Sequence, residues 1–262
     1  MHVSRHFSGR PTRASLGGLA ALGLVAALSA CGGEGRPDAA TAYRDAVKAL
    51  DDAGSGSYSF VTETDGMQLI RTDGSWQLDP RRHRSATTLS DGTGEEQGSA
   101  TVTQVVDQEK VWTLPAAHAT KDDCWRARAT DQPASGIPGP LRLLLEGEGE
   151  EWDGEGDVIR ANGPASALLT AFGALTEKVT DPAPETRVEF TLLLDEGRPS
   201  ALRTDLGAVL RAAEDGGSTV PEALAPLATE QVVIPVLASF GDLGDPVDTA
   251  PPAPEKVRSC QD

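Results

Sequence analysis

The residue best placed for chemistry in this chain is a cysteine at the end of an apolar run. Cys31 follows Leu28, Ser29 and Ala30, and the small side chains before it give a peptidase access to the backbone. Three arginines and then an uncharged stretch rich in Leu, Ala and Gly precede this sequence. A basic segment, an apolar segment and a small-residue cleavage site are typical of a secretory signal. With cysteine at the cleavage point, the pattern predicts a lipoprotein signal peptide over residues 1–30 and a diacylglycerol on the Cys31 thiol.

An uncleaved transmembrane helix is the alternative, because the 20 residues 14–33 carry no charge and could just span a bilayer. Five of them are glycines, which favours the lipoprotein signal over a spanning helix. Each buried CH2 of an acyl chain such as palmitate contributes about 0.8 kcal/mol, so two or more chains hold a protein on a membrane. We therefore expect a protein lipid-anchored at the extracytoplasmic face of the cell membrane. No twin arginine is present, which favours the Sec route.

Charge restricts the partners of the mature chain. The full sequence has a net charge of −17. The segment removed by the peptidase holds three arginines and no acid, which leaves 20 basic and 40 acidic side chains, or −20. Such a surface repels nucleic acid and anionic lipid headgroups. The sequence therefore predicts no nucleic-acid partner, and membrane contact through the N-terminal acyl anchor.

Two further cysteines, Cys124 and Cys260, remain once Cys31 carries lipid. In an oxidising compartment this count predicts one disulfide, with two separate free thiols as the alternative. A bridge closing so long a loop contributes about 4–5 kcal/mol in the chain-entropy model. The Cys124–Cys260 pair would tie the C-terminus to the middle of the chain.

No catalytic, cofactor or metal motif stands out in the mature chain. His83 and His118 lie on different segments outside any metal-binding pattern, and we expect both to be exposed. Residues 146–157 are strongly acidic, but the glycine and the final glutamate of a calcium loop are missing. We therefore expect a solvated acidic loop there. Serine-nucleophile and phosphate-loop motifs are also missing, so the sequence predicts neither an enzyme nor a cofactor.

Apolar periodicity indicates helices and strands that alternate in blocks. Asp38 can cap a helix over residues 39–51, and Leu-rich or amphipathic spacing predicts helices over 138–145 and 164–179. Alternating residues predict antiparallel strands with tight turns, and we place a hairpin turn at Asp73-Gly74. The expected strands cover 57–64, 67–72, 75–78, 83–89, 100–106, 110–114, 124–128, 186–194, 201–204 and 231–240.

The simplest architecture is α+β, with residues 31–37 as a tether and residues 38–262 as a single domain whose antiparallel sheet has helices on one face. The apolar helix residues then have two interpretations: an ordinary filled core, or the lining of an apolar ligand cavity between helices and sheet. The candidate lining residues are Leu141, Leu144, Leu145, Leu168, Phe172 and Leu175.

The order of motifs resembles the LolA-like superfamily, in particular the LppX/LprG-type lipoproteins of actinobacteria. After the lipobox cysteine and the first helix come S-Y-S-F at 57–60, V-V-D-Q-E-K-V-W-T-L-P at 105–115, V-E-F-T-L-L-L-D-E-G-R-P-S-A-L at 188–202 and F-G-D-L-G-D-P-V at 240–247. The resemblance spans about residues 39–254. It implies a curved antiparallel half-barrel with helices packed on its concave face, and an apolar space between them that holds acyl chains.

Three functions stay open as hypotheses, and each predicts a different structural feature. A lipoprotein that binds or carries a lipid or acyl ligand predicts an apolar cavity. A non-enzymatic adaptor or sensor that binds a cell-envelope protein predicts a filled core and an exposed apolar patch. An extracytoplasmic enzyme predicts a cleft with strongly perturbed titratable groups.

Overall fold

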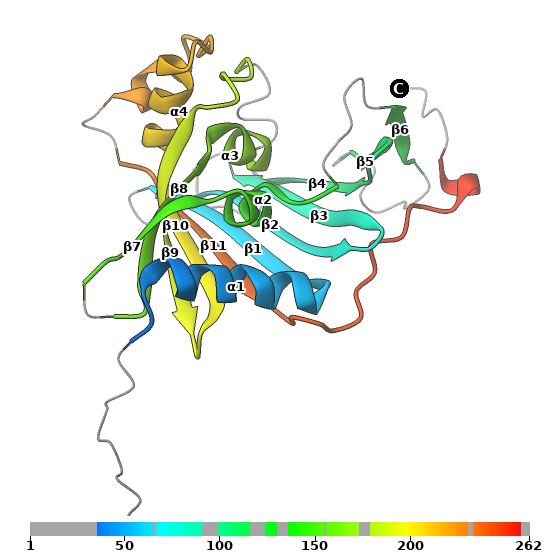
Figure 1. Cartoon of the computed structure of the whole chain (residues 1–262). Helices are drawn as coiled ribbons and strands as arrows, with labels where there is room; N and C mark the ends of the chain where they lie inside the picture. Colours follow the sequence, from blue (N-terminus) through cyan, green and yellow to red (C-terminus); the bar gives the residue numbers. More distant parts are fainter. Residues whose placement is uncertain are drawn as a thin grey trace, which may run out of the picture. The chain divides into compact units, whose positions relative to one another are not determined.

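The computed structural model describes residues 36–64, 67–90, 99–115, 124–129, 136–154, 156–172, 179–229 and 233–257. Residues Pro37–Asp262 form one compact unit, and it is described here by itself. Its described residues build one open antiparallel sheet of eleven strands with helices on the concave face, which confirms the α+β half-barrel (Figure 1). The strands are β1 (Ser55–Thr64), β2 (Met67–Leu78), β3 (Arg81–Ser90), β4 (Ser99–Val106), β5 (Lys110–Leu114), β6 (Arg126–Ala129), β7 (Glu148–Trp152), β8 (Val158–Pro164), β9 (Arg187–Asp195), β10 (Arg198–Asp205) and β11 (Pro235–Gly241).

The strand order is β6-β5-β4-β3-β2-β1-β11-β10-β9-β8-β7. The first six strands therefore form one half of the sheet as a meander, and the last five form the other half. Between β6 and β7 the chain crosses from one edge of the sheet to the opposite edge, and helix α2 (Gly139–Leu145) lies in that crossing. Pairing of β1 with β11, for example Phe60 opposite Ala238, joins the two halves.

Helix α1 (Ala39–Ala53) confirms the expected helix and begins where the sequence predicts. The Asp38 carboxylate accepts a hydrogen bond from the Thr41 backbone N–H at 2.9 Å, which caps the first turn. The helix ends at Gly54, whose φ of 68° is the left-handed conformation that favours glycine. The Tyr43 hydroxyl donates to the Leu144 carbonyl at 2.6 Å and so ties α1 to α2.

The predicted hairpin turn at Asp73-Gly74 is wrong, because β2 runs through it without a break. Gly74 is needed here for space. A Cβ atom at this position would lie 2.6 Å from both the Tyr58 ring and the Arg84 carbonyl. The glycine therefore marks a close approach between strands, a use of glycine that resembles a turn signal in sequence.

The predicted acidic loop is also wrong in part, since Glu148–Trp152 forms β7, an edge strand paired with β8. Exposed carboxylates on an edge strand disfavour pairing with other chains. Helix α3 (Ala165–Ala171) covers the start of the predicted 164–179 helix, and residues 173–178 lie outside the described residues. Helix α4 (Leu206–Asp215) was not expected.

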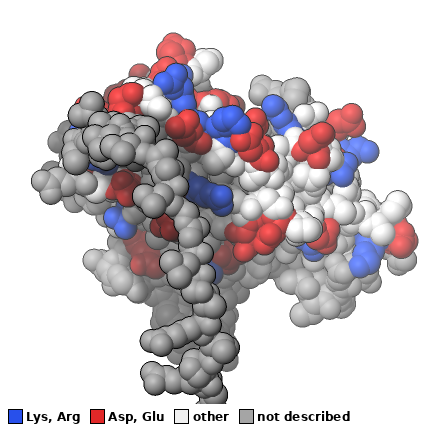
Figure 2. Space-filling view, turned by 60° about the horizontal axis from the view of Figure 1, so that its bottom comes forward, with Lys and Arg blue, Asp and Glu red and all other residues white. Residues whose placement is uncertain are grey.

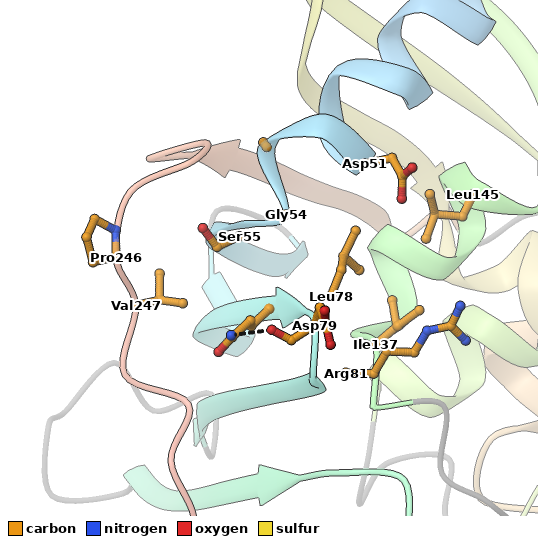
Figure 3. Close-up of a pocket in the computed structure, with 12 residues that line it drawn as sticks. Asp51, Gly54, Ser55, Leu78, Asp79, Arg81, Ile137, Leu145, Pro246 and Val247 are labelled. Carbon is orange, nitrogen blue, oxygen red and sulfur yellow. Dashed lines mark hydrogen bonds between the residues drawn. The ribbon is translucent and has the colours of Figure 1, made fainter.

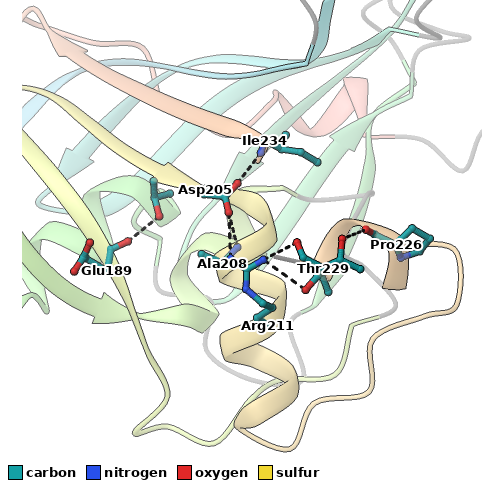
Figure 4. Close-up of polar contacts among 9 residues, drawn as sticks. Glu189, Asp205, Ala208, Arg211, Pro226, Thr229 and Ile234 are labelled. Atoms are coloured by element: carbon teal, nitrogen blue, oxygen red, sulfur yellow. Dashed lines mark hydrogen bonds and ion pairs between the residues drawn. The ribbon is translucent and has the colours of Figure 1, made fainter. Parts of the chain in front are cut away.

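Asp205 fixes the unexpected helix α4 to the sheet (Figure 4). Its carboxylate caps the helix by accepting from the Ala208 N–H at 2.8 Å, and it also accepts from the Ile234 N–H at 2.6 Å. Arg211 lies 3.6 Å from the same carboxylate and donates to the Thr229 carbonyl at 2.9 Å. One side chain thus joins the end of β10, the start of α4 and the chain leading into β11.

Replacing Asp205 by Ala should lower the free energy of unfolding by about 1–3 kcal/mol, because two backbone N–H groups lose their acceptor. Asp215→Ala is the matched control, since Asp215 is exposed at the far end of the same helix. Chemical denaturation of both variants measures the difference. Equal stability of the two variants would contradict this role for Asp205.

A second, smaller core lies apart from the main one. It contains Val105, Trp112, Leu114 and Trp125, with Cys124 and Val257 packed against it. Arg84 contributes a cation–π contact 5.9 Å from the centre of the Trp125 ring. The Trp125 backbone N–H donates to the Lys256 carbonyl at 3.1 Å, so residues 242–257, the C-terminal strap, end beside Cys124. Cys260 lies outside the described residues, and the disulfide stays a prediction that this approach of the strap supports.

Cys124→Ser and Cys260→Ser should each lower the free energy of unfolding by about 2–5 kcal/mol, if the two thiols form one bridge. The double variant should be no less stable than either single variant, since each alone removes the same bridge. Denaturation of all three proteins under oxidising conditions measures this. Additive losses in the double variant would show that the thiols act separately.

Candidate functional site

A cavity of about 840 Å³ lies between the first half of the sheet and the segments around α2 and α3. Side chains on alternate positions of a strand point to the same face. Accordingly, the residues of β1, β3 and β4 that reach the cavity alternate along each strand. The strand residues that line it are Tyr58, Phe60, Thr72, His83, Ser85, Thr87, Gln104, Val106, Val111, Arg128 and Ala129.

Helices α2 and α3 form much of the opposite wall. A Cβ atom on Gly139 would lie only 2.1 Å from the Ala167 carbonyl oxygen, so this glycine allows the two helices to touch. Ala167 and Ala171 line this wall, and their small side chains leave space for the cavity. The residues that line this wall are Ile137, Pro138, Gly139, Pro140, Arg142, Glu146, Pro164, Ser166, Ala167, Thr170, Ala171, Asp181, Pro182, Pro184 and Arg187.

Hydroxyl groups on the sheet wall are largely paired with one another. The Thr72 and Thr87 hydroxyl oxygens lie 2.9 Å apart and share a hydrogen bond. The Tyr58 hydroxyl is hydrogen-bonded to Ser85, and burial raises the Tyr58 pKa, which keeps the phenol neutral. A hydroxyl that already has a partner costs little when a ligand displaces water from it. The wall can therefore accept an apolar chain despite its polar composition.

His83 connects the sheet wall to the segment before α2. Its imidazole donates a hydrogen bond to the Gly136 carbonyl, while Nδ1 is buried without a hydrogen-bond partner in the structure. Burial lowers the pKa of His83 from 6.5 to about 4, so the ring is neutral at physiological pH. The expectation of an exposed histidine is wrong. In β3, His83, Ser85 and Thr87 alternate with Arg82 and Arg84, and this alternation could have placed the histidine on the inner face.

Three arginines line the cavity, and two of them are paired with carboxylates. Arg142 pairs with Glu146 at 2.9 Å. Arg187 lies 3.1 Å from the Glu148 carboxylate and also donates to the Glu146 carbonyl at 3.0 Å. Arg128 is exposed on the edge strand β6. Glu146 and Asp181 line the cavity as well, so its lining holds three arginines and two carboxylates.

A second cavity of about 650 Å³ lies between the end of α1, the β2–β3 turn, α2 and the C-terminal strap (Figure 3). Leu78, Leu145 and Val247 give it apolar surface, and Asp51 and Asp79 give it negative charge. Ser55, Gln77, Arg81 and Ile137 are among its other lining residues.

The predicted lining residues fall into two groups. Leu145 is half-buried and lines the smaller cavity. The others that the structure describes are fully buried in the main core, namely Leu141, Leu144, Leu168 and Phe172. Phe172 packs edge-on against Phe60, which lines the larger cavity, with ring centroids 5.1 Å apart. Leu175 lies outside the described residues. A ligand-binding role for these residues stays a prediction.

Among the described residues, no group of three or more His, Cys, Asp or Glu side chains could hold a metal ion. Within the same part of the chain, no helix is both long and apolar enough to cross a membrane.

No family model and no curated protein matches this sequence. A comparison with solved structures finds the crystal structure of LprF from Mycobacterium bovis, with 11% sequence identity and a TM-score of 0.39. The match covers 82% of this chain and 97% of LprF. The chain is thus similar to LprF over most of its length, and this likeness assigns it neither a family nor a ligand.

The depressed pKa of His83 predicts a loss of stability in acid. The unfolded chain binds a proton to this ring near pH 6.5 and the folded chain only near pH 4, so the contribution is complete above pH 6.5. This contribution of His83 to the free energy of unfolding, up to about 3 kcal/mol, should be lost as the pH falls toward 4. The free energy of unfolding, measured by denaturation at several pH values in this range, should therefore fall more steeply with decreasing pH for the wild type than for His83→Gln. An equal fall of the free energy of unfolding in both proteins would contradict a buried, neutral His83.

Proposed function

We propose that this chain is a membrane-anchored extracytoplasmic lipoprotein that binds or carries a lipid or acyl-bearing amphiphile in the larger cavity. In this proposal, residues 1–30 are removed as a signal peptide and Cys31 carries the acyl anchor. Residues 38–262 act as a single, non-enzymatic binding domain. The observation that carries the proposal is the cavity of about 840 Å³ on the concave face.

The size of the cavity supports a ligand of this class, although polar groups make up much of its lining. Protein pockets for small ligands have volumes of about 300–1,000 Å³. Val111 offers apolar surface on the sheet side, where Phe60 and Val106 are almost fully buried and the neighbouring hydroxyls are paired. The arginines beside the cavity can hold a polar or anionic headgroup. An acyl chain gains about 0.8 kcal/mol for each CH2 that it buries, so no dedicated polar contact is needed along its length.

The alternative, an adaptor for a cell-envelope protein, predicts an exposed apolar patch. Among the described residues, only Val233 and Leu237 are large hydrophobic side chains with substantial exposure. Figure 2 shows acidic and basic side chains interspersed over the face that it presents. These surfaces favour the ligand-binding proposal over the adaptor.

Native mass spectrometry of residues 37–262, produced in a lipid-containing host, tests the proposal. The wild type should carry a bound mass that denaturation releases as lipid. Thr87→Trp should abolish it, because the indole fills the cavity from β3. Thr88→Trp should retain it, since Thr88 is the next residue on the strand and points to the opposite face. A bare wild-type protein, even after incubation with lipid extract, would contradict the proposal and favour the adaptor.

A further inference from the structure

We infer that the two cavities are compartments of one binding site, separated by the side chain of Ile137. In this arrangement Ile137 sets the length of chain that the site accepts. The ligand class is an elongated acyl amphiphile with its headgroup in the larger compartment and its chain end directed toward the smaller one. This inference rests on the proposed function and names the residue that determines its specificity.

The two cavities adjoin each other at Ile137, which lines both of them. They also follow one another along β3, because Arg81 lines the smaller cavity and His83 the larger one. Residues two positions apart on a strand share a face and lie about 6.6 Å apart. Helix α2 repeats the pattern, with Leu145 in the smaller cavity and the adjacent Glu146 in the larger one.

A short segment holds Ile137 in place against β3. Gly136 has a φ of 63°, and a Cβ atom there would lie 2.5 Å from the Arg81 carbonyl oxygen. The His83 imidazole donates to the Gly136 carbonyl from the same strand. Ile137 itself is 8% exposed and belongs to the main core. The separation between the cavities at this point is therefore an apolar side chain on a fixed backbone, and shortening that side chain should connect them.

The charged residues of the two cavities indicate which end of the ligand lies in each. The charged residues that line the smaller cavity are Asp51, Asp79 and Arg81, and the excess of carboxylates disfavours an anionic headgroup there. Its apolar side chains, Leu78, Leu145 and Val247, suit the end of an alkyl chain. The larger cavity is lined by Arg128, Arg142 and Arg187 together with Glu146 and Asp181, so its basic side chains outnumber its acidic ones and suit an anionic or neutral headgroup. The chain end therefore approaches Ile137 from the arginine-bearing side.

A homologous series of straight-chain fatty acids tests this inference in the complete mature domain, residues 37–262. For the wild type, affinity should rise about fourfold per added methylene until the chain reaches Ile137, and then stop rising. Ile137→Ala should move this plateau to longer chains. Leu145→Trp added to Ile137→Ala should move it back, because the indole projects into the smaller compartment and shortens the space open to the chain end.

Ile234→Ala is the matched control, since Ile234 is also a buried isoleucine and lines neither cavity. It should lose stability without any shift of the plateau. An unchanged plateau in a folded Ile137→Ala variant that still binds fatty acids would overturn the inference and leave the proposed function intact. Failure of the wild type to bind any member of the series would overturn both.

Discussion

The pairing of β1 with β11 is the interaction on which the rest of this structure depends. Without it, the chain would hold two separate antiparallel meanders, each with an open edge in the middle of the molecule. With it, the outer edges become β6 and β7, and the chain must cross between them over a face of the sheet. The crossing segment becomes α2, which packs on the concave face. A helix placed there lines both cavities, through Leu145 in the smaller one and through Gly139, Pro140 and Arg142 in the larger one.

Close backbone contacts then fix the position of α2 relative to the sheet and to its neighbouring helices. Gly139 allows α2 to touch α3, and Gly163 lies so close to Leu143 that a Cβ atom would meet its side chain at 2.6 Å. The Tyr43 hydroxyl holds the other end of α2 to α1. Because these contacts are tight, the cavities are part of the folded arrangement and do not depend on loosely packed helices. Small residues at a few positions thus produce both a dense core and the hollow beside it.

The sequence predicted the elements well where periodicity was strong. The helix capped by Asp38, the strands β1, β3, β4, β5 and β6, and the strands β9, β10 and β11 were placed within a few residues, whereas β8 was not expected. Gly74 gave a wrong turn prediction because a glycine needed for a close approach has the same appearance in sequence as one in a turn. The carboxylates of β7 concealed an edge strand, since repeated charges are typical of loops. Helix α4 was missed although Asp205, the residue that caps it, is visible in the sequence.

The candidate site was harder to predict for a physical reason. The Leu-rich stripe of α2 and the apolar residues of α3 predicted buried residues correctly, but burial does not distinguish a filled core from the lining of a cavity. Leu141 and Leu168 lie in the filled part, while the larger cavity is lined by Ser85, Thr87 and Gln104, which seem unremarkable in sequence. Their pairing across strands becomes visible only when the register is known. The shared position of Ile137 depends on the crossing of the chain and has no local sequence signal.

The most direct test of the central claim is a crystal structure of residues 37–262 with a fatty acid that carries bromine at its chain end. Anomalous scattering then locates the chain end without any assumption about the density of the ligand. The account predicts bromine inside the concave-face cavity, against Ile137. Bromine only on the outer surface, or no bound fatty acid at all, would contradict the account.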